Sequence, residues 1–553
     1  MLKKTVAGLL IGGLGLGLFS FKTENERYFD IAKNLDIFAT LFKEVNTYYV
    51  DEVTPGKLVK TGIDAMLKSL DPYTNYISED DIEDFRTQTT GQYGGIGAVV
   101  GKRDGKTIVQ LPYEGMPAQK AGLLIGDEIL KIDGLVLDKK NSSDVSKLLK
   151  GQAGTVVKVE VKRYGVEKPF EVAITRDKIQ IDNVPYYGMV TNDIGYFQLS
   201  GFTMDASREV KNAVMKLKEM GAQKIIFDLR DNPGGLLNEA VNISNLFVEK
   251  GKDIVSTKGK VTEWNKVYKA LDEPLDTQIP LVIITSSRSA SASEIVSGVM
   301  QDYDRAVLVG ERTFGKGLVQ ATRPLSYNSQ LKVTTAKYYI PSGRCIQEVD
   351  YSHRKEDGSL GKIPDSLRVA FKTAGGRTVF DGGGVAPDVE VKDKDFADIS
   401  KTLVNKGYLF EYANKYRSEH PTIPPAKEFS ISDAEYQKFV AFLGKKDISY
   451  STSVEKSIED LVKKAKDEKH YDDIKTDVDV LKKKIAHNKA NDLSRFKPEI
   501  KELLEQEIAL RYYFQKGAIE ASFDDDQDII TAMNVLNDPQ KFQGLLKSNP
   551  NKK

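Results

Sequence analysis

The first part of the chain repeats apolar residues every three or four positions, which predicts amphipathic helices. The two stripes contain Ile31, Leu35, Ile37, Phe38, Leu41, Phe42 and Val45, and then Leu58, Val59, Ile63, Met66 and Leu67. The turn residues of Asp71–Asn75 end this pattern. We therefore predict an N-terminal helical region over residues 26–87.

The pattern changes to short alternating segments over residues 88–170. A glycine-rich turn at Gly91–Gly97 leads into a strand, and residues 156–163 alternate apolar and polar side chains. Two short helical stretches, at 117–121 and 142–149, interrupt the strands. This order predicts a small, partly open β-barrel with two helices.

Apolar strands and amphipathic helices alternate through residues 171–397. The expected strands are Ile194–Leu199, Lys224–Leu229, Leu281–Thr285 and Ala306–Gly310, and the expected helices are Ala206–Met220 and Asn238–Val248. Such alternation favours a β/α domain built on a largely parallel sheet.

The last region, residues 398–553, is rich in charge and helical in its periodicity. Residues 454–485 and 500–514 predict solvated helices with apolar stripes, which leaves open a helical bundle or an oligomer contact. A chain of 553 residues also exceeds what one hydrophobic core supports. We therefore predict a multidomain α+β protein.

Residues 1–25 have the pattern of an export signal. Lys3 and Lys4 precede the uncharged stretch Thr5–Phe21, and polar residues follow it. The stretch is short for a membrane span and contains five glycines. We predict a cleaved signal peptide or, if cleavage does not occur, a membrane anchor; a buried core helix is the alternative.

Composition narrows the functional class. The 80 basic and 80 acidic residues cancel, so the net charge gives no reason to expect a nucleic-acid partner. Cys345 is the only cysteine, which excludes an intramolecular disulfide and a cysteine-based metal site. We interpret Cys345 as a packed small side chain.

Ser291 follows a predicted strand and precedes a predicted helix. It begins the Ser-x-x-Glu pattern that ends at Glu294, so one interpretation is a helix-capping box. The same position also exposes a hydroxyl at a helix N-terminus, where the Ala292 amide and the helix dipole stabilise an oxyanion. Ser291 is therefore a candidate nucleophile.

A serine nucleophile needs a base, and none of the four histidines lies near Ser291 in the sequence. Lys316, between two glycines, accepts a proton only if burial keeps its amine neutral. Gln320, four residues on, either holds that amine or is an ordinary polar strand residue. The spacing from Gly310 to Lys316 also matches the start of a phosphate-binding loop, but Gly317 stands where that loop has Ser or Thr.

Two glycine turns are candidate anion sites. In Asp228–Gly235, the last two residues offer backbone N–H groups to a developing negative charge, although an ordinary turn has the same sequence. Gly94–Gly97 is typical of a loop that binds a carboxylate through backbone amides, beside a strand edge that accepts a peptide.

Together these motifs resemble the C-terminal processing peptidases, also called tail-specific proteases, over residues 30–395. The matching segments are Leu70–Thr74, Gly94–Gly97, Ala121–Leu123 with Gly126-Asp127, Asp228–Gly235, Ser289–Ile295, Thr313–Gly317 and Tyr338–Arg344. The resemblance implies a serine peptidase core of the crotonase/Clp-like β/α type at residues 171–397. It also implies an inserted PDZ domain at residues 88–170 and no metal or organic cofactor.

The resemblance also assigns roles by position. It implies that Ser291 is the nucleophile, Lys316 the general base and Gln320 the residue that orients Lys316. The remaining implied residues are Ala292, Gly234 and Gly235 for the oxyanion hole, and Gly95, Ile96 and Gly97 for the substrate's C-terminal carboxylate. Asp302 falls where some members carry an aspartate reported to matter, and a structural turn is the competing account.

The expected function is cleavage of unfolded or tail-tagged proteins by an exported endopeptidase that recognises their C-termini through the PDZ domain. The expected location is the periplasm of a bacterial cell envelope, soluble or anchored to the inner membrane through residues 5–21. The sequence leaves open an adaptor protein and a homo-oligomer. The alternative is an inert PDZ-bearing scaffold, although complete Ser291 and Lys316 motifs argue against it.

Overall fold

The computed structural model describes residues 24–354, 359–392, 394–444 and 446–547. The predicted signal or anchor at residues 5–21 lies outside these ranges. Within them, no helix is both long enough and apolar enough to cross a bilayer. The chain divides into two compact units, Met1–Tyr76 and Ile77–Lys553.

The first unit contains the two helices that the apolar periodicity predicts, α2 (Glu24–Tyr48) and α3 (Pro55–Lys68). Pro55 occupies the first turn of α3, where its missing N–H has no helical partner to lose. Several large apolar side chains of α2, among them Leu35 and Phe38, are more than half exposed. The apolar stripe that predicts this helix is therefore not fully buried within the described chain.

The second unit begins with α4 (Ile82–Thr90), and β1 (Asn75–Ile77) lies across the boundary between the units. Next comes the predicted small barrel. Its elements are β3 (Ala98–Arg103), β4 (Lys106–Pro112), α5 (Pro117–Lys120), β5 (Glu128–Ile132), β6 (Leu135–Val136), α6 (Ser142–Leu149), β7 (Val156–Lys162) and β8 (Phe170–Thr175). β2 (Gln92–Gly95) pairs with β9 (Asp177–Gln180) at the two ends of this segment, so a two-stranded stem carries the barrel.

The β/α domain is built on a six-stranded sheet. Its order is β10 (Tyr186–Met189), β11 (Ile194–Gln198), β12 (Lys224–Asp228), β15 (Leu281–Thr285), β16 (Val307–Gly310) and β23 (Val389–Glu390). β10 and β11 are antiparallel, whereas every other neighbouring pair is parallel. The prediction of a largely parallel sheet is thus confirmed.

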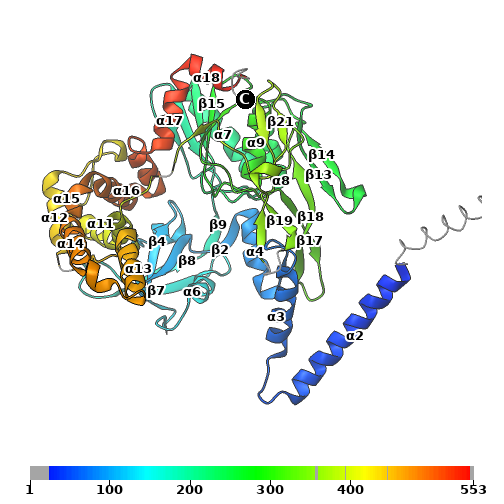
Figure 1. Ribbon diagram of the computed structural model, residues 1–553, viewed down its shortest axis with the longest axis horizontal. Helices are drawn as coiled ribbons and strands as arrows, with labels where there is room; N and C mark the ends of the chain where they lie inside the picture. Colours follow the sequence, from blue (N-terminus) through cyan, green and yellow to red (C-terminus); the bar gives the residue numbers. More distant parts are fainter. Residues whose placement is uncertain (1–23, 355–358, 393, 445, 548–553) are drawn as a thin grey trace, which may run out of the picture. The chain divides into compact units, whose positions relative to one another are not determined.

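Different parts of the chain cover the two faces of this sheet (Figure 1). The helices α7 (Ala206–Glu219), α8 (Leu237–Asn245) and α9 (Ala292–Asp302) share a core with Phe227. The last helices, α17 (Gln527–Leu536) and α18 (Pro539–Leu545), share a core with Ile226. Ile226 and Phe227 are consecutive residues of β12, so their side chains point to opposite faces of the sheet. The C-terminal helices therefore complete the hydrophobic core of the β/α domain.

A second sheet takes strands from both sides of the segment that contains Lys316. It includes β14 (Lys266–Lys269), β13 (Asp253–Gly259), β18 (Gln330–Tyr339) and β17 (Leu318–Pro324), the last of which pairs with β18. The pairings among these four strands are antiparallel. Two hairpins come next, β19 (Val349–Arg354) with β20 (Leu360–Lys362), and β21 (Ala370–Lys372) with β22 (Thr378–Phe380).

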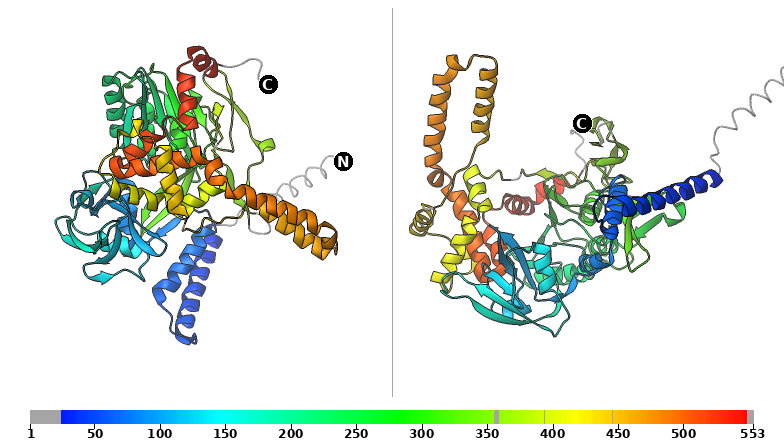
Figure 2. Two further views of the ribbon diagram at one scale, coloured as in Figure 1. Left: turned by 90° about the vertical axis from the view of Figure 1, so that its left-hand side faces the viewer. Right: turned by 90° about the horizontal axis from the view of Figure 1, so that it is seen from below.

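The C-terminal region is helical, as expected. One cluster buries residues of α10 (Asp398–Asn405), α11 (Tyr408–Glu419), α12 (Asp433–Leu443) and α16 (Lys497–Ser522). By contrast, α13 (Ser453–Asp467) and α14 (Tyr471–Ala490) form a paired hairpin with mostly exposed side chains, followed by the short α15 (Asp492–Arg495) (Figure 2). The expected solvated helix is thus found at residues 454–485, whereas the stripe within 500–514 is buried.

Candidate active site

Ser291 lies in a sharp turn between β15 and α9. Its φ of 57° and ψ of −109° are strained for a residue with a Cβ atom. The turn packs against Gly234, where an added Cβ would lie 2.6 Å from the Ala290 carbonyl oxygen and 2.9 Å from the Ser291 Cβ. Only glycine therefore allows the β12–α8 turn to approach the serine so closely.

Ser289 and Ser293, which flank Ser291 in the sequence, stabilise this turn through hydrogen bonds. Ser289 donates to the Leu229 carbonyl oxygen at 2.8 Å, and Ser293 donates to the Asn232 carbonyl oxygen at 2.9 Å. Both side chains are fully buried, whereas Ser291 is partly exposed. Of the three hydroxyls, the one at the predicted nucleophile position is the one that a substrate can reach.

Lys316 lies in the loop between β16 and β17, and this loop is fastened to the serine turn. Phe314 N–H donates to the Ser289 carbonyl oxygen at 3.0 Å. The Glu294 carboxylate oxygen Oε2 accepts Ser291 N–H at 2.8 Å and Lys316 N–H at 2.9 Å. The two amide nitrogens thus share one acceptor and lie no more than about 6 Å apart. The structure brings together two segments that are 25 positions apart in the sequence.

Gln320 lies on β17, where the register with β18 shifts between Val319 and Gln320. Such a bulge turns a side chain away from the regular direction of its strand, and bulges are common beside active sites. The Gln320 side-chain amide donates to Thr334 Oγ1 on β18 at 3.1 Å. Gln320 therefore lies one short strand segment from Lys316 and is held by the neighbouring strand.

The predicted oxyanion donors differ in their hydrogen bonding. Gly234 N–H donates to Asn232 Oδ1 at 2.9 Å. Among the residues that the structure describes, no acceptor is found for the N–H groups of Gly235 and Ala292. These two amides are therefore the ones left available to a substrate oxygen, while Gly234 shapes the turn.

Asp302 lies at the far end of α9, eleven positions after Ser291 and about 16 Å along the helix axis. Its carboxylate pairs with Arg344 at 2.9 Å, and both side chains are 1 % exposed. It also accepts Ser342 N–H at 2.9 Å. This arrangement is an internal ion pair that joins a helix end to a neighbouring loop.

Cys345 follows that arginine. Its Sγ lies 3.2 Å from the position of a Cβ at Gly317, beside Lys316. Burial raises the pKa of the thiol, which keeps it protonated and unreactive. The contact agrees with the interpretation of Cys345 as a packed side chain.

The predicted carboxylate loop, Gly94–Gly97, includes the last two residues of the stem strand β2 and leads into β3 of the barrel. Gly97 has a φ of 71°, and a Cβ there would lie 2.5 Å from Met116. Beside the loop is a small cleft of about 50 Å³ at the edge strand β3. Its lining residues are Tyr93, Ile96, Ala98, Val100, Ser146, Leu149 and Lys150. A strand edge beside a small cleft with apolar and polar side chains suits the last residues of an extended peptide.

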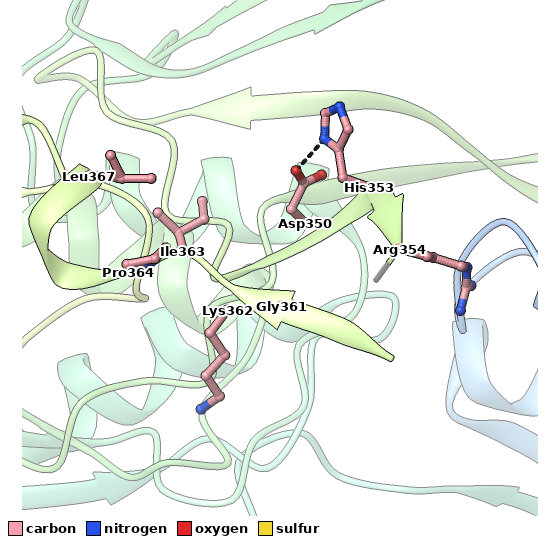
Figure 3. Close-up of a pocket in the computed structure, with 8 residues that line it drawn as sticks. All are labelled: Asp350, His353, Arg354, Gly361, Lys362, Ile363, Pro364 and Leu367. Carbon is pink, nitrogen blue, oxygen red and sulfur yellow. Dashed lines mark hydrogen bonds and ion pairs between the residues drawn. The ribbon is translucent and has the colours of Figure 1, made fainter. Parts of the chain in front are cut away.

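A larger cavity of about 270 Å³ lies on the β19–β20 hairpin (Figure 3). Figure 3 shows His353 pointing toward Asp350, and their closest atoms are 2.7 Å apart. Ile363, Pro364 and Leu367 form its apolar wall. The cavity includes none of the candidate site residues. Within the described chain, no group of three or more His, Cys, Asp or Glu side chains is arranged to hold a metal ion.

Three segments of the chain match known protein families. Residues 193–352 match peptidase family S41, and residues 108–163 match the PDZ domain. Residues 399–536 match a family described as the C-terminal helical domain of a probable PDZ-protease. The matched segments follow the domain order of the fold.

Several known proteases are similar to this chain over much of its length. The carboxy-terminal-processing protease of Bartonella bacilliformis is 38% identical over 334 residues, which cover 60% of this chain and 76% of that protein. The probable CtpA-like serine protease of Staphylococcus aureus (strain COL) is 38% identical over 393 residues, covering 69% and 77%. A solved photosystem II D1 C-terminal processing protease is 28% identical and covers 64% of this chain and 92% of its own, with a TM-score of 0.35.

These matches define the class of protein: a serine peptidase whose core carries an inserted PDZ domain. The extent of the identity with the curated relatives then shows the family. The chain belongs to peptidase family S41 and is a C-terminal processing protease.

Proposed function

We propose that this protease is exported, binds the C-terminal tails of unfolded proteins in its PDZ domain, and cleaves their peptide bonds through an acyl-enzyme on Ser291. The main support is the Glu294 carboxylate, which accepts hydrogen bonds from the backbones of both Ser291 and Lys316. A nucleophile and a base must lie within reach of each other before either can act.

In this mechanism, Ser291 Oγ attacks the substrate carbonyl carbon while its proton passes to the neutral amine of Lys316. The amides of Gly235 and Ala292 stabilise the resulting oxyanion. Lys316 then gives the proton to the leaving amine, and the acyl group remains on Ser291 as an ester. Water attacks this ester as it loses a proton to Lys316, and Lys316 then gives that proton to the departing Ser291 Oγ, which releases the peptide acid and regenerates the serine hydroxyl. Gln320 orients the lysine amine.

The proposed location is the periplasm of a bacterial cell envelope. Lys3 and Lys4 followed by the uncharged stretch Thr5–Phe21 support export. N-terminal sequencing of the protein from fractionated cells tests this proposal. A mature N-terminus near residue 25 in the periplasmic fraction supports it, an intact N-terminus in the membrane fraction supports an anchor, and a cytoplasmic location contradicts it.

The cleavage proposal is tested with an unfolded model protein that ends in small apolar residues. The wild type should degrade it, whereas Ser291→Ala should bind it and leave it intact, since the hydroxyl that forms the ester is missing. The matched control substrate is the same protein with an amidated C-terminus, which lacks the carboxylate that the Gly94–Gly97 loop would bind, and it should be cut more slowly. Cleavage by Ser291→Ala at the wild-type rate would refute the assignment, and a stable complex without cleavage by the wild type would favour the scaffold.

A further inference from the structure

Glu294 is the third residue of α9 and is completely buried. Its oxygen Oε1 accepts hydrogen bonds from Thr313 Oγ1 at 2.6 Å and Gly315 N–H at 2.7 Å. Its oxygen Oε2 accepts Ser291 N–H and Lys316 N–H at 2.8 and 2.9 Å. An ionised carboxylate offers about four acceptor positions, so these four donors use all of them.

The four donors also indicate the ionisation state of the Glu294 carboxyl group. Burial raises the pKa of Glu294, and the hydrogen bonds from Thr313 and the three backbone amides act in the opposite direction. Three of the four donors are backbone amides, which cannot accept a hydrogen bond, so a carboxyl proton would have only the Thr313 hydroxyl as a partner. The arrangement therefore fits the carboxylate, whose charge is dispersed over neutral hydrogen-bond donors.

A helix cap explains only a small part of this arrangement. The capping box needs the contact between Ser291 N–H and the Glu294 side chain. The other three donors belong to residues 313–316, which are 19 to 22 positions away and come after β16. A residue that merely began a helix would need none of them.

The contacts join two loops that the sheet alone does not align. β15 and β16 are neighbouring parallel strands, but the serine turn and the lysine loop extend beyond their paired residues. Proton transfer requires heavy atoms about 2.6–3.2 Å apart. A displacement of about 1 Å can lower a rate about 100-fold. A rigid link between the loops is therefore required for efficient proton transfer.

We propose that Glu294 is a positioning residue, which holds the Ser291 turn and the Lys316 loop at the separation that proton transfer needs. This inference rests on the proposed roles of Ser291 and Lys316. Glu294 does not touch the substrate; its carboxylate fixes the backbone at both reacting residues. Thr313 belongs to the same link, because its hydroxyl donates to Glu294 and accepts Val385 N–H at 2.7 Å.

Glu294→Gln tests the link with little change in shape. The Gln amide has one oxygen, so its NH₂ group would face two of the four donors. We expect kcat to fall about 100-fold, whereas KM and the affinity for a tail peptide should change less than about threefold because the PDZ domain is untouched. The thermal midpoint measures whether the variant remains folded.

Thr313 supplies a matched pair in case Glu294→Gln does not fold. Thr313→Val keeps the shape of the side chain and removes both hydrogen bonds, whereas Thr313→Ser keeps both. We expect kcat to fall about tenfold for the valine variant, whereas the serine variant should retain at least about half of the wild-type kcat. Both losses are smaller than the loss of about 100-fold for a displacement of about 1 Å, because three of the four hydrogen bonds to Glu294 remain.

Wild-type kcat in Thr313→Val or in a folded Glu294→Gln would overturn the proposal, as would a loss confined to KM. Equal losses in the Val and Ser variants would also contradict it, because the hydrogen bonds would then be irrelevant. If instead the proposed function is wrong, Ser291→Ala would still cut the substrate. That result does not depend on the activities of the Glu294 and Thr313 variants.

Discussion

The two ends of helix α9 each carry a buried acidic side chain, and the two have different kinds of partner. Glu294, in the first turn, accepts hydrogen bonds from four neutral donors. Asp302, the last residue, pairs with the guanidinium of Arg344. Burial raises the pKa of both carboxyl groups. The same helix thus buries two carboxylates with different partners.

The difference shows what each arrangement can do. Neutral backbone donors tie separate loops to one point, and so Glu294 can set the geometry of a reaction. A charged partner compensates a charge that would otherwise be costly to bury. Asp302 lies about 16 Å along the helix from Ser291, which is too far for contact with the reacting atoms. We infer that the first carboxylate serves catalysis and the second serves the fold.

The largest expected effect in this comparison is on stability, at Asp302. Asp302→Asn leaves the buried Arg344 without its counter-charge, and we expect a loss of about 3–5 kcal/mol in the free energy of unfolding. Denaturant unfolding measures the loss, and kcat per folded molecule should stay near the wild-type value. A lower kcat at unchanged stability would instead make Asp302 part of the chemistry.

Gly234→Ala tests the other end of the helix. The new Cβ would lie 2.6 Å from the Ala290 carbonyl oxygen, so the serine turn must move. We expect kcat to fall about 10- to 100-fold, as for a reacting group displaced by about 1 Å. Gly251→Ala is the control, because Gly251 also has a positive φ but nothing lies within 4 Å of its Cβ position. Equal kcat losses in both variants would exclude displacement as the cause.

A partly buried carboxylate in another region, Asp528, gives the smallest expected effect. Arg230 pairs with Asp228, Asp526 and Asp528, so one guanidinium is shared among three carboxylates. Burial, together with these acidic neighbours, raises the pKa of Asp528 to about 6 despite Arg230. The folded protein therefore binds this proton more tightly than the unfolded chain, and stability falls as the pH rises from the ordinary value of 3.8 through about 6.

Asp528→Asn should therefore be more stable than the wild type at pH 7.5, and this advantage should shrink as the pH falls to 5. Urea unfolding midpoints at several pH values measure the difference. An advantage that grows toward pH 5 would have the wrong sign, and would mean that the pKa of Asp528 is lowered in the folded protein.

Sequence patterns predict much of this fold for identifiable reasons. The β/α alternation and the barrel follow from local periodicity, and the family resemblance rests on motifs around Ser291 and Lys316. The wider role of Glu294 is not visible in the sequence, because the capping box is local whereas three of its donors come from a distant loop. The strained φ of Ser291 and its close approach to Gly234 are likewise features that only the folded chain creates.

Hydrophobic periodicity does not predict two other features of the fold. The helix α17 packs on a sheet whose strands β10, β11, β12, β15 and β16 lie more than 200 residues earlier in the chain, and local periodicity does not predict that partner. The stripe of α2 predicts burial, yet many of its large side chains are exposed. Periodicity identifies the face of a helix, whereas its partner depends on the topology of the whole chain.

The central claim is that Ser291 is made nucleophilic by Lys316. The most direct measurement is the reaction of the protein with a fluorophosphonate, followed by peptide mapping and timed in the wild type and in Lys316→Ala. The account predicts a single phosphonylated residue, Ser291, and a much slower reaction in Lys316→Ala. Label on Ser289 or Ser293 instead, or an unchanged rate without the lysine, would contradict it.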